Sequence, residues 1–132
     1  MIKQLIHACT SAIFKRNKFR YYLRDRHIRD TTFAALDLEL TSLEAASSHI
    51  TSIGYVAGRA GHISLASSGY HIIKTNGDLG QSPVIHGLTQ DILSEGEDIA
   101  EGLAAVSSLF KDNILLFHNA RLDLMALNSA FK

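Results

Sequence analysis

The chain has 132 residues, of which 46% are hydrophobic and 20% charged, and its acidic and basic residues are equal in number. This length fits one domain of about 100–200 residues, and no apolar run approaches the roughly 20 residues that span a bilayer. We therefore expect a cytoplasmic protein with no membrane partner. The single Cys9 excludes a disulfide bond within the chain, which fits a reducing compartment.

The first 30 residues form a basic segment, with eight Lys and Arg residues against two Asp, so the remainder of the chain is acidic. Apolar residues recur there at helical spacing, which predicts an amphipathic helix packed against the domain. Aromatic residues also interleave with the charges, at Phe19, Tyr21 and Tyr22. An alternative role is therefore contact with a single nucleic-acid strand through stacking and phosphate binding.

An apolar run over residues 33–43 contains two carboxylates two positions apart, Asp37 and Glu39. Because side chains alternate along a strand, both acids point to the same face of a sheet. Oxygen donors of this kind suit Mg²⁺ or Mn²⁺. In an isolated Asp-x-Glu the ordinary explanation is a pair of solvated acids. The rest of the chain must decide between that explanation and a metal site.

Alternating and β-branched residues predict three consecutive strands, at 32–38, 49–57 and 61–75. The segment 58–61 is the expected hairpin connection between the second and third strands. Gly69 predicts a bulge or a break in the third strand. Sequential strands of this kind usually lie side by side in one antiparallel sheet.

Helical signals follow a turn-rich stretch at 76–83. Thr89 is expected to cap a short helix that runs to Leu93, and Ser94 with Glu97 forms a predicted capping box for the next helix. That helix is marked by apolar residues at helical spacing, Ile99, Leu103, Val106 and Phe110, and stops at Asn113. From Asn113 the chain reads as a strand that enters a final helix, striped by Leu124, Leu127 and Phe131.

Three segments of the chain resemble the DEDD (DnaQ-like) superfamily of 3′–5′ exonucleases, which includes the proofreading epsilon subunit of bacterial DNA polymerase III. Residues 37–42, Asp-Leu-Glu-Leu-Thr-Ser, are similar to its first motif, Asp-x-Glu-Thr-Thr-Gly. Residues 85–89, Ile-His-Gly-Leu-Thr, are similar to its Ile-His-Gly-Ile-Thr segment, and residues 118–123, His-Asn-Ala-Arg-Leu-Asp, to its second motif, His-Asn-Ala-x-Phe-Asp. The departures are Leu40, Ser42 and Leu122.

The resemblance implies an α/β protein of the ribonuclease H-like exonuclease fold, with a mixed sheet and flanking helices, in which residues 31–132 form the N-terminal part of the exonuclease domain. It implies hydrolysis of phosphodiesters from a 3′ end with two Mg²⁺ or Mn²⁺ ions. Asp37, Glu39 and Asp123 would be the catalytic residues and metal ligands. The substrate would be the 3′ end of DNA or RNA, and a DNA polymerase subunit is an expected partner. Substrate-binding residues carried over from the motifs are Leu40, Thr41, His86, His118 and Asn119.

The superfamily's third motif, a His or Tyr followed by an Asp within a helix, is not found after Asp123. Two pairs satisfy the bare spacing, His86 with Asp91 and His118 with Asp123. The first begins in the Ile-His-Gly-Leu-Thr segment, before the second motif, and the second is the second motif itself. We therefore expect a domain truncated at its C-terminus, and activity impaired by the missing base. The alternatives are a noncatalytic module that binds nucleic-acid ends or a polymerase, and a remnant of an exonuclease. A homodimer that covers the unfinished sheet is a further expectation.

Overall fold

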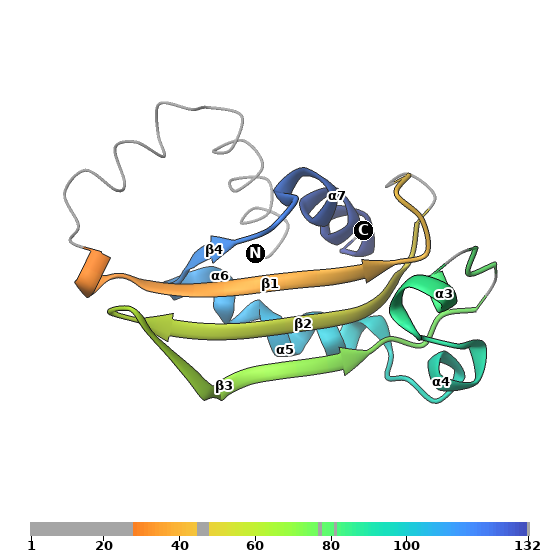
Figure 1. The fold of residues 1–132 in the computed structure, drawn as a ribbon, viewed down its shortest axis with the longest axis horizontal. Helices are drawn as coiled ribbons and strands as arrows, with labels where there is room; N and C mark the ends of the chain where they lie inside the picture. Colours follow the sequence, from red (N-terminus) through yellow and green to blue (C-terminus); the bar gives the residue numbers. More distant parts are fainter. Residues whose placement is uncertain (1–27, 45–47, 77, 81, 132) are drawn as a thin grey trace.

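The computed structural model describes residues 28–44, 48–76, 78–80 and 82–131. The predicted basic helical segment, 1–30, lies outside these residues except for a short 3-10 helix, η1 (Ile28–Asp30). The described part is a mixed α/β structure in which helices flank a four-stranded sheet (Figure 1). None of the described helices is long and apolar enough to span a membrane.

The sheet consists of β1 (Thr32–Leu40), β2 (Ile50–Arg59), β3 (His62–Ile72) and β4 (Ile114–Leu116). The spatial order is β3-β2-β1-β4, with β1 antiparallel to β2 and parallel to β4. All four predicted strands are confirmed. The strand that carries the two acids is therefore an inner strand of the sheet, flanked by β2 and β4.

The third strand is shorter and more irregular than the sequence indicates. It ends at Ile72, and Ile73 instead forms an isolated bridge with Glu97. The predicted irregularity is present, but it lies between Ser64 and Ser68, where the β2–β3 register shifts between Val56 and Ala57. Gly69 is needed for another reason. A Cβ atom there would lie 2.5 Å from Cζ of the Tyr55 ring, which crosses from β2.

The hairpin connection between β2 and β3 is a two-residue turn formed by Ala60 and Gly61, with φ angles of 54° and 78°. Two consecutive positive φ angles match the type I′ turn that suits the right-handed twist of a hairpin. Gly61 adopts this conformation freely, whereas an L-residue such as Ala60 pays a steric penalty of about 1–2 kcal/mol.

Replacing Ala60 by Asn should therefore raise the free energy of unfolding by about 0.5–1 kcal/mol, because Asn tolerates this conformation. Urea denaturation followed by circular dichroism measures the change. The reverse control, Ala60→Val, should lower the unfolding free energy, since a β-branched residue is disfavoured there. An unchanged midpoint in both variants would contradict the turn assignment.

The main core lies on one face of the sheet. Leu36, Leu38 and Leu40 alternate along β1 and are all buried. They pack with apolar residues of β2 and with three helices, α5 (Ile99–Ser107), α6 (Leu109–Asp112) and α7 (Ala120–Ala130). The residues between them on β1, which include Asp37 and Glu39, must point to the opposite face. The alternation that builds the core therefore also fixes the direction of both acids.

The opposite face of the sheet is covered at one end by two short helices, α3 (Ser82–His86) and α4 (Gln90–Ser94) (Figure 1). A second small core holds them there through Leu79, Leu88 and Leu93, against which Ile72 of β3 packs. Thr89 caps α4 as predicted, accepting a hydrogen bond from the Ile92 amide. The sequence had not predicted α3, which ends at His86.

The predicted capping box of Ser94 and Glu97 is wrong. Ser94 ends α4, and Asp98 caps α5 by accepting a hydrogen bond of 2.8 Å from the Ala100 amide. Glu97 is engaged elsewhere, because its backbone pairs with β3 and its carboxylate contacts His71. The stop at Asn113 is confirmed, although the helix breaks at Ser108 into α5 and α6.

Candidate active site

Asp37 and Glu39 both lie on the face of β1 opposite the main core, as the alternation predicts. Asp37 is exposed and its cross-strand neighbour on β2 is Gly54, whereas Glu39 is half-buried beside α3. Burial raises the pKa of Glu39, His86 opposes that rise, and the carboxylate of Asp37 adds to it. The two acids are therefore close enough to repel each other.

Glu39 has a specific partner, His86 at the end of α3. The Oε2 atom of Glu39 lies 2.7 Å from Nδ1 of His86, and both side chains are half-buried. This contact brings together two of the segments that resemble the exonuclease superfamily, residues 37–42 and residues 85–89. The sequence placed His86 among the substrate-binding residues, but the ring is engaged with a predicted metal ligand.

Asp123 approaches the acids from α7 and is nearly buried, with 7% of its surface exposed. Burial raises the pKa of its carboxyl group to about 6. The Asp37 carboxylate contributes to the rise, while hydrogen bonding from the backbone of Asp123 and of Leu38, together with His118, opposes it. The side chain therefore reaches β1 beside Asp37, so residues far apart in sequence meet at one place.

His118 and Asn119 lie between β4 and α7, and both are exposed. Asn119 occupies the N-cap position of α7 without a side-chain cap, and its carbonyl oxygen accepts hydrogen bonds from the amides of Leu122 and Asp123 at 2.9 and 3.3 Å. The backbone of Asn119 thus orients the turn that carries Asp123. Its side chain and that of His118 remain open to solvent.

Leu40 and Thr41, which the resemblance places against substrate, have structural contacts here. The side chain of Leu40 is buried in the main core. The hydroxyl group of Thr41 accepts a hydrogen bond of 3.0 Å from the His49 amide, and its own amide donates to the His49 carbonyl. The two residues close the connection from β1 to β2, and their side chains are not presented beside Asp37.

A groove of about 730 Å³ runs beside Asp37 on this side of the sheet. Its walls come from three neighbouring strands and the segment after β4, and most of them are apolar. The lining residues used below are Asp37, Gly54, Val56, Leu116 and His118. Leu116 is about half exposed. The groove therefore places an acid at the border of an open apolar surface.

The donor chemistry of the three acids fits a hard divalent cation, since carboxylate oxygens are the ligands that Mg²⁺ and Mn²⁺ prefer. The raised pKa of Asp123, due to burial and to Asp37, is the observation that favours a cation there, because positive charge would relieve both costs. Within the described residues, however, no three His, Cys, Asp or Glu side chains are close enough to hold an ion. Glu39 is turned to His86 instead.

Two features of β3 were not predicted from the sequence. On the main-core face, the His71 ring contacts the Glu97 carboxylate and stacks on Tyr55 with centroids 5.8 Å apart. On the opposite face, Tyr70 is an exposed residue two strands away from Asp37. The period-two pattern of β3 contained the signal for Tyr70, since residues 70 and 72 share a face. Nothing local could have paired His71 with Glu97.

No protein-family model matches the chain. Curated relatives carry the name DNA polymerase III PolC-type. One, from Thermotoga maritima, is 34% identical over 101 residues, which cover 75% of this chain and 7% of the relative. Another, from Mycoplasmopsis pulmonis, is 31% identical over 119 residues, covering 86% of this chain and 8% of the relative. The chain thus spans less than a tenth of the length of these relatives.

Among solved structures, the chain is similar to exonuclease I. The apo form superposes with a TM-score of 0.69 at 18% identity, covering 77% of this chain and 24% of that one. The metal-free form of the E. coli exonuclease I complex with single-stranded DNA gives 0.68 at 18% identity, with the same coverage. The fold is therefore the ribonuclease H-like exonuclease fold. These comparisons confirm that the chain resembles the DEDD exonuclease superfamily, in sequence as in fold.

Proposed function

We propose that the chain is the N-terminal part of a 3′–5′ exonuclease domain that removes nucleotides from the 3′ end of a nucleic-acid strand. The observation that carries the proposal is the meeting of Asp37 on β1 with Asp123 on α7, where burial and mutual repulsion raise the pKa of Asp123 to about 6. Such perturbed carboxyl groups mark functional sites more often than ordinary surfaces.

The three acids share one role in this proposal. Asp37, Asp123 and Glu39, the last once separated from His86, would hold Mg²⁺ or Mn²⁺. Bound there, two such ions would supply the positive charge that activates water and offsets the charge of the phosphate. Without them, the carboxyl group of Asp123 retains a proton up to about pH 6. In the structure His86 holds the carboxylate of Glu39, and the apolar groove lies directly beside Asp37.

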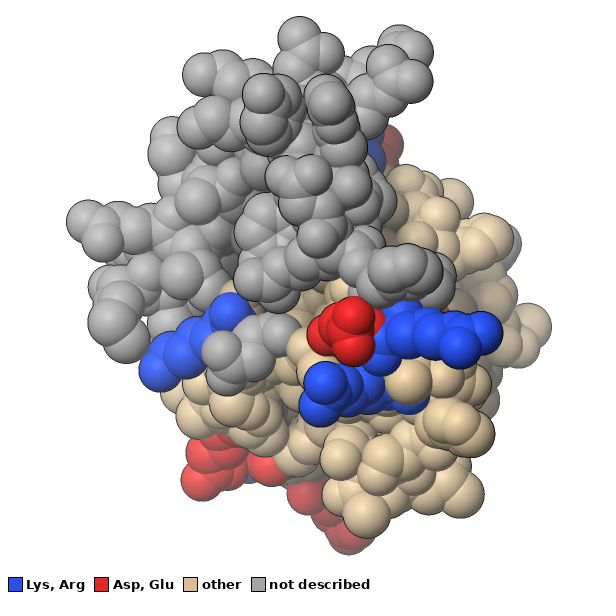
Figure 2. All heavy atoms as spheres, turned by 90° about the vertical axis from the view of Figure 1, so that its left-hand side faces the viewer, with Lys and Arg blue, Asp and Glu red and all other residues tan. Residues whose placement is uncertain are grey.

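Positive charge at the far end of the sheet supports binding of a nucleic-acid strand. Lys and Arg side chains gather around an acidic residue on the face that carries η1 and the β2–β3 hairpin (Figure 2). Arg29 and Arg59 are exposed at this end. Phosphate contacts by such residues provide affinity that does not depend on sequence. A strand that leaves Asp37 along β1 would reach them.

The proposal predicts that a single strand labelled at its 5′ end is shortened stepwise from its 3′ end in Mg²⁺ or Mn²⁺, but not in EDTA. Asp37→Ala should lower the rate at least about 100-fold, a typical cost of removing one electrostatic group from a catalytic site. The matched control is Asp91→Ala, an exposed acid on α4. Equal rates for the parent and Asp37→Ala would sink the proposal.

A second candidate is a noncatalytic module that binds nucleic-acid ends. The observation in its favour is the pairing of Glu39 with His86, together with the lack of a three-donor cluster in the described ranges. The same assay distinguishes the two, since this module would bind the strand and leave it intact.

We further propose a cytoplasmic site of action and a polymerase partner, which fits the name of the PolC-type relatives. Co-purification with a polymerase subunit and sedimentation would test the partner and the expected homodimer.

A further inference from the structure

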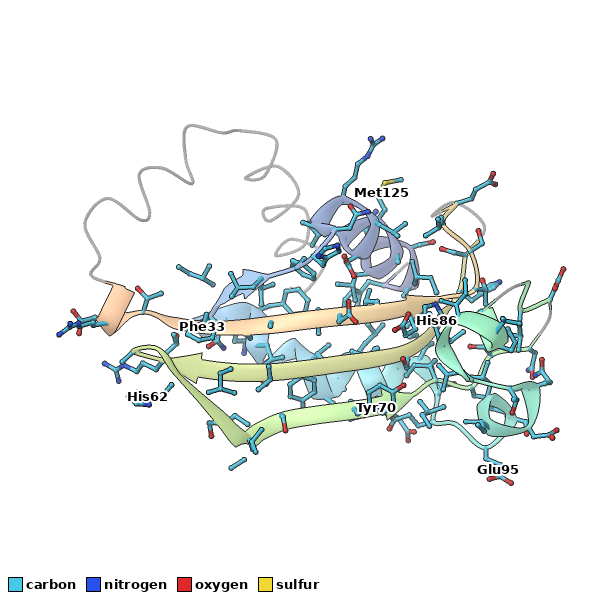
Figure 3. All side chains as sticks on the ribbon, viewed as in Figure 1. Phe33, His62, Tyr70, His86, Glu95 and Met125 are labelled. Carbon is cyan, nitrogen blue, oxygen red and sulfur yellow. The ribbon has the colours of Figure 1, made fainter. Side chains whose placement is uncertain are left out.

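Tyr70 stands in one row with the candidate catalytic Asp37. Asp37 on β1 pairs across the sheet with Gly54 on β2, and Gly54 pairs with Tyr70 on β3. Directly paired residues share a face of a sheet, so all three belong to the face opposite the main core. Figure 3 shows Tyr70 on β3 in the half of the sheet nearer to α3 and the labelled His86.

The glycine between them allows the tyrosine ring to lean across β2. A Cβ atom built on Gly54 would lie 3.6 Å from Cδ2 of Tyr70 and 3.9 Å from the carbonyl oxygen of Asp37. The ring therefore occupies space above Gly54, between β3 and the strand that carries the acid. Covering a glycine in this way is a structural role of its own, but it uses only one side of the ring. Tyr70 remains 61% exposed.

The ring lies next to Gly54, which also lines the groove beside Asp37. Gly54 and Asp37 both line the groove, and both belong to the row of paired residues that includes Tyr70. Val56, the next residue of β2 on this face, and Leu116 provide an apolar floor. A nucleotide whose phosphate lies at Asp37 would have its sugar over this floor. A base of the same strand would then come within reach of the Tyr70 ring.

We propose that Tyr70 is a stacking platform for one base of the single strand whose phosphate lies at Asp37. This inference rests on the proposed function and adds a substrate-positioning residue to it. Aromatic stacking accepts any base, because every base has a π face. The contact therefore positions a strand without reading its sequence, and it applies equally to DNA and RNA. Within a duplex the faces of the bases are already covered by stacking on their neighbours, so the platform favours unpaired ends.

Fluorescence anisotropy of labelled eight-nucleotide DNA and RNA strands of one sequence, measured in EDTA to prevent cleavage, tests the proposal. Tyr70→Ala should weaken binding about 5- to 150-fold, the range for loss of one base–aromatic stack, whereas Tyr70→Phe should retain it. The matched control is Ile63→Ala. Ile63 lies on the same strand and face, is 63% exposed, and pairs with Gly58 away from Asp37.

Strands with one abasic nucleotide, moved through the last four positions, locate the stacked base. At one position the abasic strand should bind Tyr70→Ala and the parent equally, because the stack is already absent. If the parent binds the strand and Tyr70→Ala binds as well as Ile63→Ala, the stacking inference is overturned and the proposed function stands. If the parent neither binds nor shortens any strand, both are overturned.

Discussion

Asp123→Asn should make the protein more stable at pH 8 while removing its activity. The folded-state pKa of this carboxyl group is about 6, raised from 3.8 by burial first and by Asp37 second. Holding the group charged above pH 6 therefore costs up to about 3 kcal/mol. Asn has a similar shape, keeps one acceptor oxygen for backbone hydrogen bonds and carries no charge, so it avoids this cost.

The pH at which the two proteins are compared decides how much stability Asp123→Asn gains. A raised folded-state pKa contributes stability that is fully present below the unfolded value of 3.8 and is lost as pH rises through about 6. The gain of Asp123→Asn over the parent should thus be about 1–3 kcal/mol at pH 8 in EDTA and vanish near pH 3.5. Urea denaturation at several pH values measures it, with Asp91→Asn as the control. A gain that is independent of pH would contradict the burial of a charged Asp123.

The activity of Asp123→Asn, measured by strand shortening in Mg²⁺, should fall at least about 100-fold. Stability and activity then change in opposite directions at one residue, which a residue important only for folding would not show. Such opposition is common at functional sites, where groups are held in environments that folding alone disfavours. Loss of both stability and activity would indicate that Asp123 is a structural residue.

Leu127→Ala should cost about 2–5 kcal/mol of unfolding free energy, the usual range for truncating a buried Leu. Leu127 is completely buried, and its side chain joins α7 to the core formed by β1, α5 and α6. Since domains of this size are stable by only about 5–15 kcal/mol, the loss is large. It also loosens the helix that holds Asp123 against β1.

The matched control is Met125→Ala on the same helix. Met125 is 45% exposed and points away from the core (Figure 3). Its truncation should change the unfolding free energy by less than about 0.5 kcal/mol. Thermal denaturation of both variants in one buffer compares them. Similar losses in the two would mean that α7 is not anchored through Leu127.

The sequence predicted the elements that depend on local signals. The alternation of β1 placed Asp37 and Glu39 on one face, and Thr89 was recognised as a cap because its partner lies in the same turn. The Ser94 and Glu97 box failed because Asp98 is an equally good cap, and because pairing with β3 fixes Glu97 in space. Local patterns alone could not reveal that competition.

The same limit applies to the candidate site. The meeting of Glu39 with His86, and of Asp37 with Asp123, requires contacts between segments far apart in the chain, which only the family resemblance suggested. The resemblance in turn gave Leu40 a place against substrate, while the packing of β1 buries its side chain. The raised pKa of Asp123 depends on burial, and burial becomes visible only once α7 is docked.

The irregular course of β3 also bears on self-association. A strand at the edge of a sheet offers unpaired backbone groups that can template aggregation. In the described sheet the two edges are β3 and β4. The register shift between Ser64 and Ser68 divides β3 into two short stretches, and β4 has only three residues. Within the described sheet, neither edge therefore presents a long, regular row of donors and acceptors for pairing with a further strand.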